Sequence, residues 1–230
     1  MHHLTHQEGA STYATMRTHS GDLYGAAPGN CPVALILIDV INDMEYPGGD
    51  ELLPHALPAG RAIAAVKRRA RHVGVPTVYV NDNFGRWRAD FKSQVRHCLE
   101  DGVRGKPFVE LLLPDPQDYF VLKPKDSAFY ATPLAVLLEY LGARTLILAG
   151  LTADRCLLMT ASDAYLRAYT LYVPSDCTAS IVPAHNQHAL SYMARVFKAD
   201  ISASDTLDLN ALANGTNLDH LGAGRVSPHS

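Results

Sequence analysis

Long apolar runs are missing from the sequence. No stretch of its 230 residues is long enough to span a bilayer, and the first residues lack the apolar core of a signal peptide. The sequence also has no long run of Lys and Arg, and its net charge of -3 gives no basic surface for a nucleic acid. We therefore expect neither a membrane nor a nucleic acid as a partner.

Cysteine is scarce, and its spacing does not indicate a metal site. There is no CxxC pair and no zinc-ligand spacing among the four cysteines, which are Cys31, Cys98, Cys156 and Cys177. Without a secretory signal, such widely spaced thiols indicate reduced cysteines in a cytoplasmic protein.

Short apolar runs alternate with segments of helical periodicity along most of the chain. This pattern predicts an α/β fold: one doubly wound domain with a parallel sheet over residues 31–213, between a loosely ordered arm (1–30) and a frayed tail (214–230). The expected strands are 33–39, 75–80, 119–122, 145–149, 171–173 and 199–203. The expected helices are 55–72, 88–99, 132–141, 157–165 and 183–197.

Three residues with chemically reactive side chains lie at or just after the ends of three of these strands. Asp39 ends the first strand, Lys123 ends the third, and Cys156 follows the fourth strand at the start of a helix. Open α/β sheets bind their ligands at the carboxyl ends of the strands, and a thiol at a helix N-terminus ionises more easily than a free one. Each residue also has an ordinary interpretation: Asp39 as a turn cap, Lys123 as a surface residue and Cys156 as a small buried side chain.

Two aromatic residues, Phe84 and Trp87, follow the second strand. They are equally consistent with the wall of a substrate pocket and with packing of the connection against the core.

Three blocks of the sequence together resemble one family. They are LILIDVINDM, VLKPKDSAFYATPLAVLLEYLG and TLILAGLTADRCLLMTASDAY, and they lie between about residues 33 and 203. In this order and spacing they are similar to the isochorismatase-like cysteine hydrolases, which include nicotinamidases, N-carbamoylsarcosine amidases and ureidoacrylate hydrolases. The resemblance implies a six-stranded parallel sheet in the order 3-2-1-4-5-6.

The resemblance also implies a catalytic site. The family's Asp, Lys and Cys triad matches Asp39, Lys123 and Cys156, and its oxyanion hole matches the backbone N–H groups of Thr152 and Cys156. The implied reaction is hydrolysis of a C–N bond in a small amide, carbamoyl or ureido compound through a thioester. The family further predicts a cis peptide bond between Leu151 and Thr152.

The sequence departs from the family at several positions. Ile41 replaces a common Gln, and Ala153-Asp154 replaces Thr-Asn before the cysteine. Asp50, His55 and Asp82 could bind a cation, but their spacing is not that of the nicotinamidase metal site. We therefore expect no bound metal, no cofactor and a substrate other than nicotinamide.

Six residues are predicted to shape the substrate pocket, with Asp154 favouring a cationic or polar substrate group. They are Asn42, Asp82, Phe84, Trp87, Phe129 and Asp154.

Two alternative functions remain open. The isochorismatase reaction, hydrolysis of a vinyl ether on the same fold, needs an acid but no thiol, so Cys156 disfavours it. A non-catalytic member of the family is disfavoured by the intact triad, although a fold alone does not establish function. The resemblance also implies a small-molecule substrate and a homo-oligomer, either a dimer or a tetramer.

Overall fold

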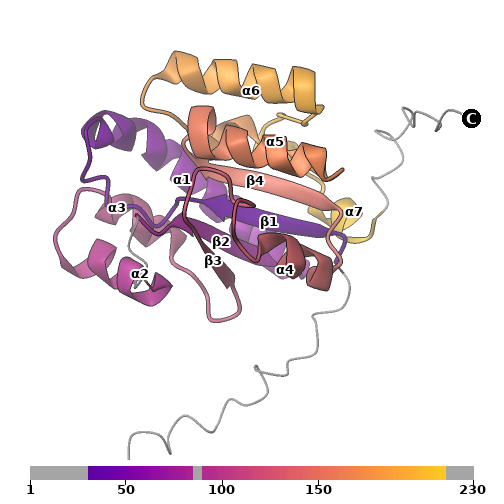
Figure 1. Ribbon diagram of the computed structural model, residues 1–230, viewed down its shortest axis with the longest axis horizontal. Coiled ribbons are helices and arrows are strands. Elements are labelled where there is room, and N and C mark those ends of the chain that lie inside the picture. Colours follow the sequence, from indigo (N-terminus) through magenta and orange to yellow (C-terminus); the bar gives the residue numbers. More distant parts are fainter. Residues whose placement is uncertain (1–30, 85–89, 216–230) are drawn as a thin grey trace, which may run out of the picture.

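The computed structural model describes residues 31–84 and 90–215 (Figure 1). The predicted N-terminal arm, Trp87 and nearly all of the predicted tail lie outside these ranges. None of the described helices is both long and apolar enough to cross a membrane.

A parallel sheet forms the centre of the fold. Its strands are β1 (Val33–Ile38), β2 (Thr77–Asp82), β3 (Tyr119–Lys123), β4 (Thr145–Leu151), β5 (Thr170–Tyr172) and β6 (Thr178–Ala179). The order is β3-β2-β1-β4-β5, and β6 pairs with the end of β4. Asp200 forms a parallel bridge with Tyr172, so the chain returns to the sixth position beside β5. The predicted α/β architecture and strand order are confirmed.

Strand β1 shows why apolar runs mark the centre of this sheet. It pairs with β2 on one side and β4 on the other, and all six of its residues are buried. Alternate side chains face opposite sides of the sheet, so Leu35 and Leu37 enter one core cluster, whereas Ile36 and Ile38 enter the other. Both faces of β1 are therefore covered by helices, as in other parallel sheets.

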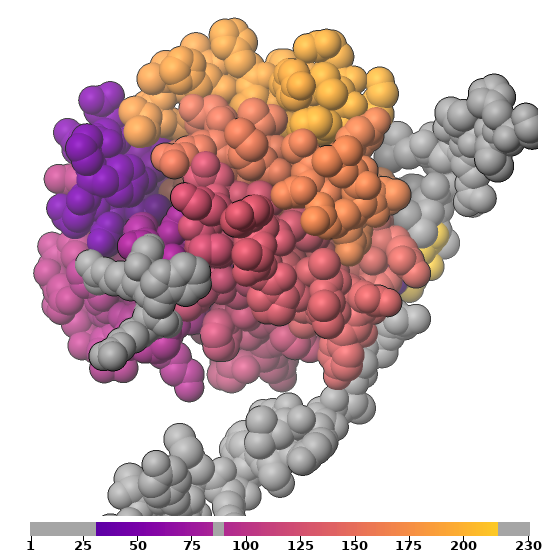
Figure 2. Space-filling model, in the orientation of Figure 1, coloured from indigo at the N-terminus to yellow at the C-terminus, as the bar shows by residue number. Residues whose placement is uncertain are grey.

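Two layers of helices cover the sheet. One core cluster is capped by α1 (Gly49–His72), α2 (Phe91–Glu100), α3 (Lys106–Val109) and α7 (Leu209–Ala213). The other is capped by α4 (Leu134–Leu141), α5 (Leu158–Leu166) and α6 (Pro183–Phe197). Helices α5 and α6 pack against each other (Figure 1). In Figure 2, residues from about 125 to 170, coloured rose to orange, form one continuous surface on the face in view.

Short helical turns lie between the longer elements. These are η2 (Glu110–Leu112), the π-helical turn η3 (Ala153–Leu157), η4 (Ser175–Cys177) and η5 (Ser204–Thr206).

Three elements differ from the sequence prediction. Helix α1 begins at Gly49 rather than at 55, because burial of Leu52 and Ala56 holds its first turns in place despite Pro54 and Pro58. Residues 101–117, for which no helix or strand was expected, contain α3 and η2. The strand expected at 199–203 is reduced to the bridge at Asp200.

Gly150 does not end β4, as the sequence suggested, but lies within it. Its φ of +129° is in the region that favours glycine, and a Cβ atom there would lie 2.0 Å from the Ile38 carbonyl oxygen. Glycine thus allows β4 to lie against the end of β1 and to continue to Leu151, directly before the turn that carries Cys156.

Candidate active site

The three side chains predicted to meet at the carboxyl edge of the sheet do meet there. The Lys123 ammonium nitrogen lies 2.9 Å from Asp39 Oδ2 and 3.5 Å from Cys156 Sγ. The ammonium group therefore contacts both the acid and the thiol.

Asp39 directly follows β1 and has an unusual backbone. Its φ of 52° is in the left-handed region, which non-glycine residues seldom adopt and which occurs often at functional sites. Its Oδ1 atom accepts a hydrogen bond of 2.8 Å from the Asp82 N–H, at the end of the neighbouring strand β2. The carboxylate is thus held by main chain on one oxygen and by Lys123 on the other.

Lys123 ends β3 and is completely buried. Strand β3 is separated from β1 by β2, so the long lysine side chain bridges the end of β2 to reach Asp39. It also lies 3.5 Å from Asp82 Oδ2. A buried ammonium needs such partners, because an isolated charge without water is very costly.

Cys156 lies in the π-helical turn between β4 and α5. The turn is closed by a hydrogen bond of 3.2 Å from the Leu157 N–H to the Thr152 carbonyl. Thr160 Oγ1 donates to the Cys156 carbonyl (2.7 Å) and accepts from the Ala128 N–H (3.0 Å). One threonine thereby connects the cysteine turn to the loop after Lys123.

The backbone before this turn matches the family resemblance. The peptide bond between Leu151 and Thr152 is cis, as predicted. Thr152 and Cys156, whose N–H groups were predicted to form the oxyanion hole, lie directly before and within the π-helical turn.

Burial controls the protonation of the site. It raises the pKa of the Asp39 carboxyl above its usual range, although Lys123 and the hydrogen bond with Cys156 oppose the shift. Burial would lower the pKa of Lys123, yet Asp39 and Cys156 raise it overall.

Burial also raises the pKa of the Cys156 thiol; the Asp39 charge adds to this shift, and Lys123 opposes it. The expectation that the start of a helix makes this thiol easy to ionise is therefore wrong, because the loss of water outweighs the helix dipole. The same burial thus favours the protonated thiol and makes Asp39 a stronger proton acceptor than an ordinary carboxylate.

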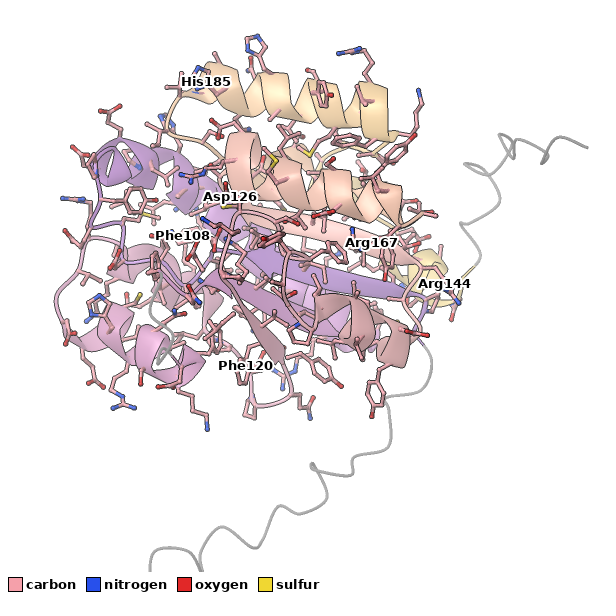
Figure 3. The ribbon with its side chains drawn as sticks, viewed as in Figure 1. Phe108, Phe120, Asp126, Arg144, Arg167 and His185 are labelled. Atoms are coloured by element: carbon pink, nitrogen blue, oxygen red, sulfur yellow. The ribbon has the colours of Figure 1, made fainter. Side chains whose placement is uncertain are left out.

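A second acid and a second cation flank the thiol, and the sequence reasoning missed both. Asp126 Oδ1 lies 3.9 Å from Cys156 Sγ and 3.0 Å from Arg155 Nε. Figure 3 shows Asp126 and His185 toward one end of the molecule and Arg144, which directly precedes β4, at the other. The signals were present in the chain: Arg155 is adjacent to the cysteine, and Asp126 follows Lys123 by three residues.

Three of the predicted pocket residues lie near the triad or near a hollow beside it. Asp82 contacts Lys123, and Asn42 is hydrogen-bonded to Tyr46, whose phenol interacts electrostatically with Asp39 and Cys156. Phe84 is half exposed and lines a cavity of about 460 Å³ together with Tyr46.

A larger hollow of about 680 Å³, between the end of α1 and residues 205–210, contains none of the predicted site residues.

Two other predicted pocket residues have different contacts. Phe129 is buried in the core, where its ring stacks on Tyr169 with centroids 6.0 Å apart. The Asp154 carboxylate accepts a hydrogen bond of 2.6 Å from Ser180 and lies 3.7 Å from His185 Nδ1. Asp154 thus connects the cysteine turn to the start of α6 and has a partner other than a substrate.

Metal-binding chemistry has little support among the described residues. They contain no group of three or more His, Cys, Asp or Glu side chains that could hold a metal ion. Asp50 and His55 are exposed on α1. All four cysteines are free, and burial raises the pKa of Cys98 and Cys177 to about 12.

Comparisons with known proteins agree with the fold and with the family resemblance. The model of the isochorismatase domain matches residues 33–205. An uncharacterized isochorismatase family protein of Bacillus subtilis, YaaI, is 37% identical over 76% of this chain and 95% of its own. Maleamate amidohydrolase of Pseudomonas putida is 28% identical over 76% of this chain and 82% of its own. The crystal structure of N-carbamoylsarcosine amidase from Thermoplasma acidophilum has a TM-score of 0.60 and 31% identity, covering 76% of this chain and 98% of that one.

Proposed function

Because the chain belongs to the isochorismatase family of hydrolases, we propose that it is a cysteine hydrolase that cleaves the C–N bond of a small amide, carbamoyl or ureido compound. Asp39, Lys123 and Cys156 carry the reaction, and a thioester on Cys156 is its intermediate. The observation that carries the proposal is the buried Lys123 ammonium, which contacts both the Asp39 carboxylate and the Cys156 sulfur.

The first half of the reaction forms the thioester. Asp39 accepts the thiol proton, which its raised pKa favours, and Lys123 stabilises the thiolate as it forms. The sulfur attacks the carbonyl carbon, and the C–N bond of the resulting tetrahedral intermediate breaks. Protonated Asp39 returns its proton to the leaving nitrogen, so ammonia or an amine departs uncharged.

The second half restores the enzyme. A water molecule gives a proton to Asp39 and attacks the thioester carbonyl. The C–S bond then breaks, and the sulfur recovers its proton from Asp39. The products are a carboxylic or carbamic acid and the free thiol.

The N–H groups of Thr152 and Cys156 would stabilise the oxyanion in both halves. Both belong to the turn that presents the sulfur: Thr152 directly precedes its first residue, and Cys156 lies within it. Losing one donor of such a pair typically costs about 10²–10³ in rate.

The relatives support this reaction class. Two of the similar proteins are by name an amidohydrolase of maleamate and an amidase of N-carbamoylsarcosine, so both act on C–N bonds next to a carbonyl. By analogy, we assign this chain a small amide, carbamoyl or ureido substrate rather than a vinyl ether.

The test is turnover of a panel of small amides and ureido acids by the protein and by Cys156→Ala. We expect the substitution to abolish ammonia release, and rapid acid quenching of the native protein to yield a mass adduct equal to the acyl group. Cys31→Ala is the matched control: Cys31 is a buried free thiol just before β1, at the edge of the sheet opposite the triad, so its loss should leave ammonia release per folded molecule unchanged. Full ammonia release by Cys156→Ala would overturn the proposal.

A further inference from the structure

The residue before the nucleophile is an exposed arginine held beside the sulfur. We propose that Arg155 binds a carboxylate of the substrate, so that this enzyme prefers amides or ureido compounds that also carry an acid group. This inference rests on the proposed function and assigns its substrate class.

The Asp126 carboxylate positions the guanidinium group. Asp126 Oδ1 accepts from Arg155 Nε at 3.0 Å, and the same oxygen lies 3.9 Å from Cys156 Sγ. Arginine and sulfur therefore share one carboxylate oxygen as a neighbour. Asp126 is the main cause that raises the pKa of the Arg155 guanidinium, and the nearby Cys156 and Asp82 add to this shift.

The terminal nitrogens of Arg155 are available. Its side chain is 71% exposed, and only Nε contacts another described residue in an ion pair or hydrogen bond. The guanidinium group presents its donors as a planar fork that matches the two oxygens of a carboxylate. Asp126 fixes one edge of this fork and leaves the other for a ligand.

The other charged side chains described at the site already have partners. Lys123 is completely buried and contacts Asp39 and Asp82, so its ammonium cannot serve a substrate carboxylate as well. The Asp154 carboxylate, which the sequence suggested for a cationic substrate group, accepts a hydrogen bond from Ser180. An exposed guanidinium that uses only Nε for its ion pair with Asp126, beside acids that already have partners, favours an anionic substrate over a cationic one.

The geometry also limits the length of the substrate. Arg155 and Cys156 are consecutive residues that contact the same oxygen of Asp126. A ligand that places its carbonyl carbon at the sulfur and its carboxylate at the guanidinium must therefore be short. Monoamides of four-carbon dicarboxylic acids, and ureido acids of similar length, fit this requirement.

The experiment compares succinamic acid, a monoamide with a carboxylate, with succinamide, its neutral diamide. We expect the native enzyme to prefer succinamic acid in kcat/KM. Arg155→Ala should lower kcat/KM for succinamic acid by about 10–100-fold, the range for one lost hydrogen-bonded charge pair, mainly through KM. The same variant should change the value for succinamide less than about threefold. Arg155→Lys should fall between the two, because lysine keeps the charge but not the fork.

Arg167→Ala is the matched control. Arg167 also forms an exposed ion pair, with Asp163 on α5, but packs over Phe129 and lies toward the opposite end of that helix (Figure 3). It should leave both substrates unaffected. An equal loss of both substrates in Arg155→Ala, or a native preference for succinamide, would overturn the inference.

A binding measurement separates this inference from the proposed function. Calorimetric titration of Cys156→Ala with succinamic acid needs no turnover, and we expect Arg155→Ala in that background to weaken binding at least about tenfold. Equal binding by both proteins, or no binding by Cys156→Ala, would overturn the role of Arg155 even if Cys156-dependent hydrolysis of other amides is observed. Conversely, Arg155-dependent binding without any Cys156-dependent hydrolysis would reject only the proposed reaction.

Discussion

Two ion pairs flank the Cys156 sulfur, and they differ in almost every physical respect. In the Lys123–Asp39 pair the side chains are 0% and 10% exposed, whereas in the Arg155–Asp126 pair they are 71% and 36% exposed. The first joins two strands of the sheet, and the second joins two loops at its edge. The Cys156 thiol thus lies between a buried ion pair and a solvent-exposed ion pair.

The difference in burial suits the two ion pairs to different roles, one in the reaction and one in substrate binding. A buried pair gives little net stability, because desolvation of its two charges offsets their attraction. In the proposed reaction, the buried pair instead serves proton transfer and thiolate stabilisation at the sulfur. An exposed pair costs little to rearrange, so Arg155 can exchange part of its solvent shell for a ligand without disturbing the fold.

The largest effect is expected for Lys123→Met. This substitution leaves Asp39 buried without its cation, a change that typically costs about 3–5 kcal/mol. We expect urea denaturation to show a loss of this size, and ammonia release to become undetectable. The double variant Asp39→Asn/Lys123→Met should recover much of the stability, because no unpaired charge remains, but none of the activity.

Lys67→Met is the matched control for Lys123→Met. Lys67 is a second buried lysine, 2.7 Å from Asp118 and 3.1 Å from Asp115 on the other face of the sheet. Its loss should destabilise the protein while leaving turnover per folded molecule unchanged. Comparable activity losses in the two lysine variants would contradict the separation of roles.

The next effect concerns the protonation of the thiol. The Asp39 charge helps to raise the pKa of Cys156, and Lys123 opposes it, so Asp39→Asn should lower the pKa of the thiol. In the native protein, alkylation of Cys156 by iodoacetamide should rise with pH, as the thiol ionises only at high pH. In Asp39→Asn the rise should occur at lower pH, while hydrolysis falls by about 10²–10⁴ through loss of the base.

Intact mass against pH measures this alkylation, with Cys156→Ala giving the background from the other cysteines. Asp118→Asn is the matched control, because it removes a carboxylate from the second buried pair and should not move the profile. Slower alkylation of Asp39→Asn at neutral pH would contradict the expectation that the Asp39 charge raises the pKa of the thiol.

The sequence was informative about the buried pair for a physical reason. Continuous apolar runs mark central parallel strands, and residues that end such strands must lie at one edge of the sheet. Asp39 and Lys123 could therefore be placed together from the sequence, and the family resemblance added their roles. The expected start of α1 at 55 was wrong, because the helix begins at Gly49 and tertiary packing tolerates Pro54 and Pro58 within it.

The exposed pair could not be predicted in this way. The position of Asp126 depends on how the loop after Lys123 folds against α5, which is set by side-chain contacts between distant segments. Ser127 donates to the Asp163 carboxylate, and the Ala128 N–H donates to Thr160. No local pattern in the sequence encodes such contacts, so the pairing of Asp126 with Arg155 emerged only from the structure.

The smallest effect is expected for the exposed pair itself, when stability rather than activity is measured. Exposed ion pairs typically contribute about 0–1 kcal/mol, so Arg155→Ala and Asp126→Ala should each change the free energy of unfolding by less than about 1 kcal/mol. A double-mutant cycle in urea, which does not screen charges as guanidinium chloride does, measures the coupling between the two residues. A coupling as large as that of Lys123 with Asp39 would make Arg155 a structural residue, and its effect on substrate binding would then have to be attributed to a displaced loop. A small coupling, combined with a large change in KM for succinamic acid, means that the arginine is held at the edge of the site for a ligand.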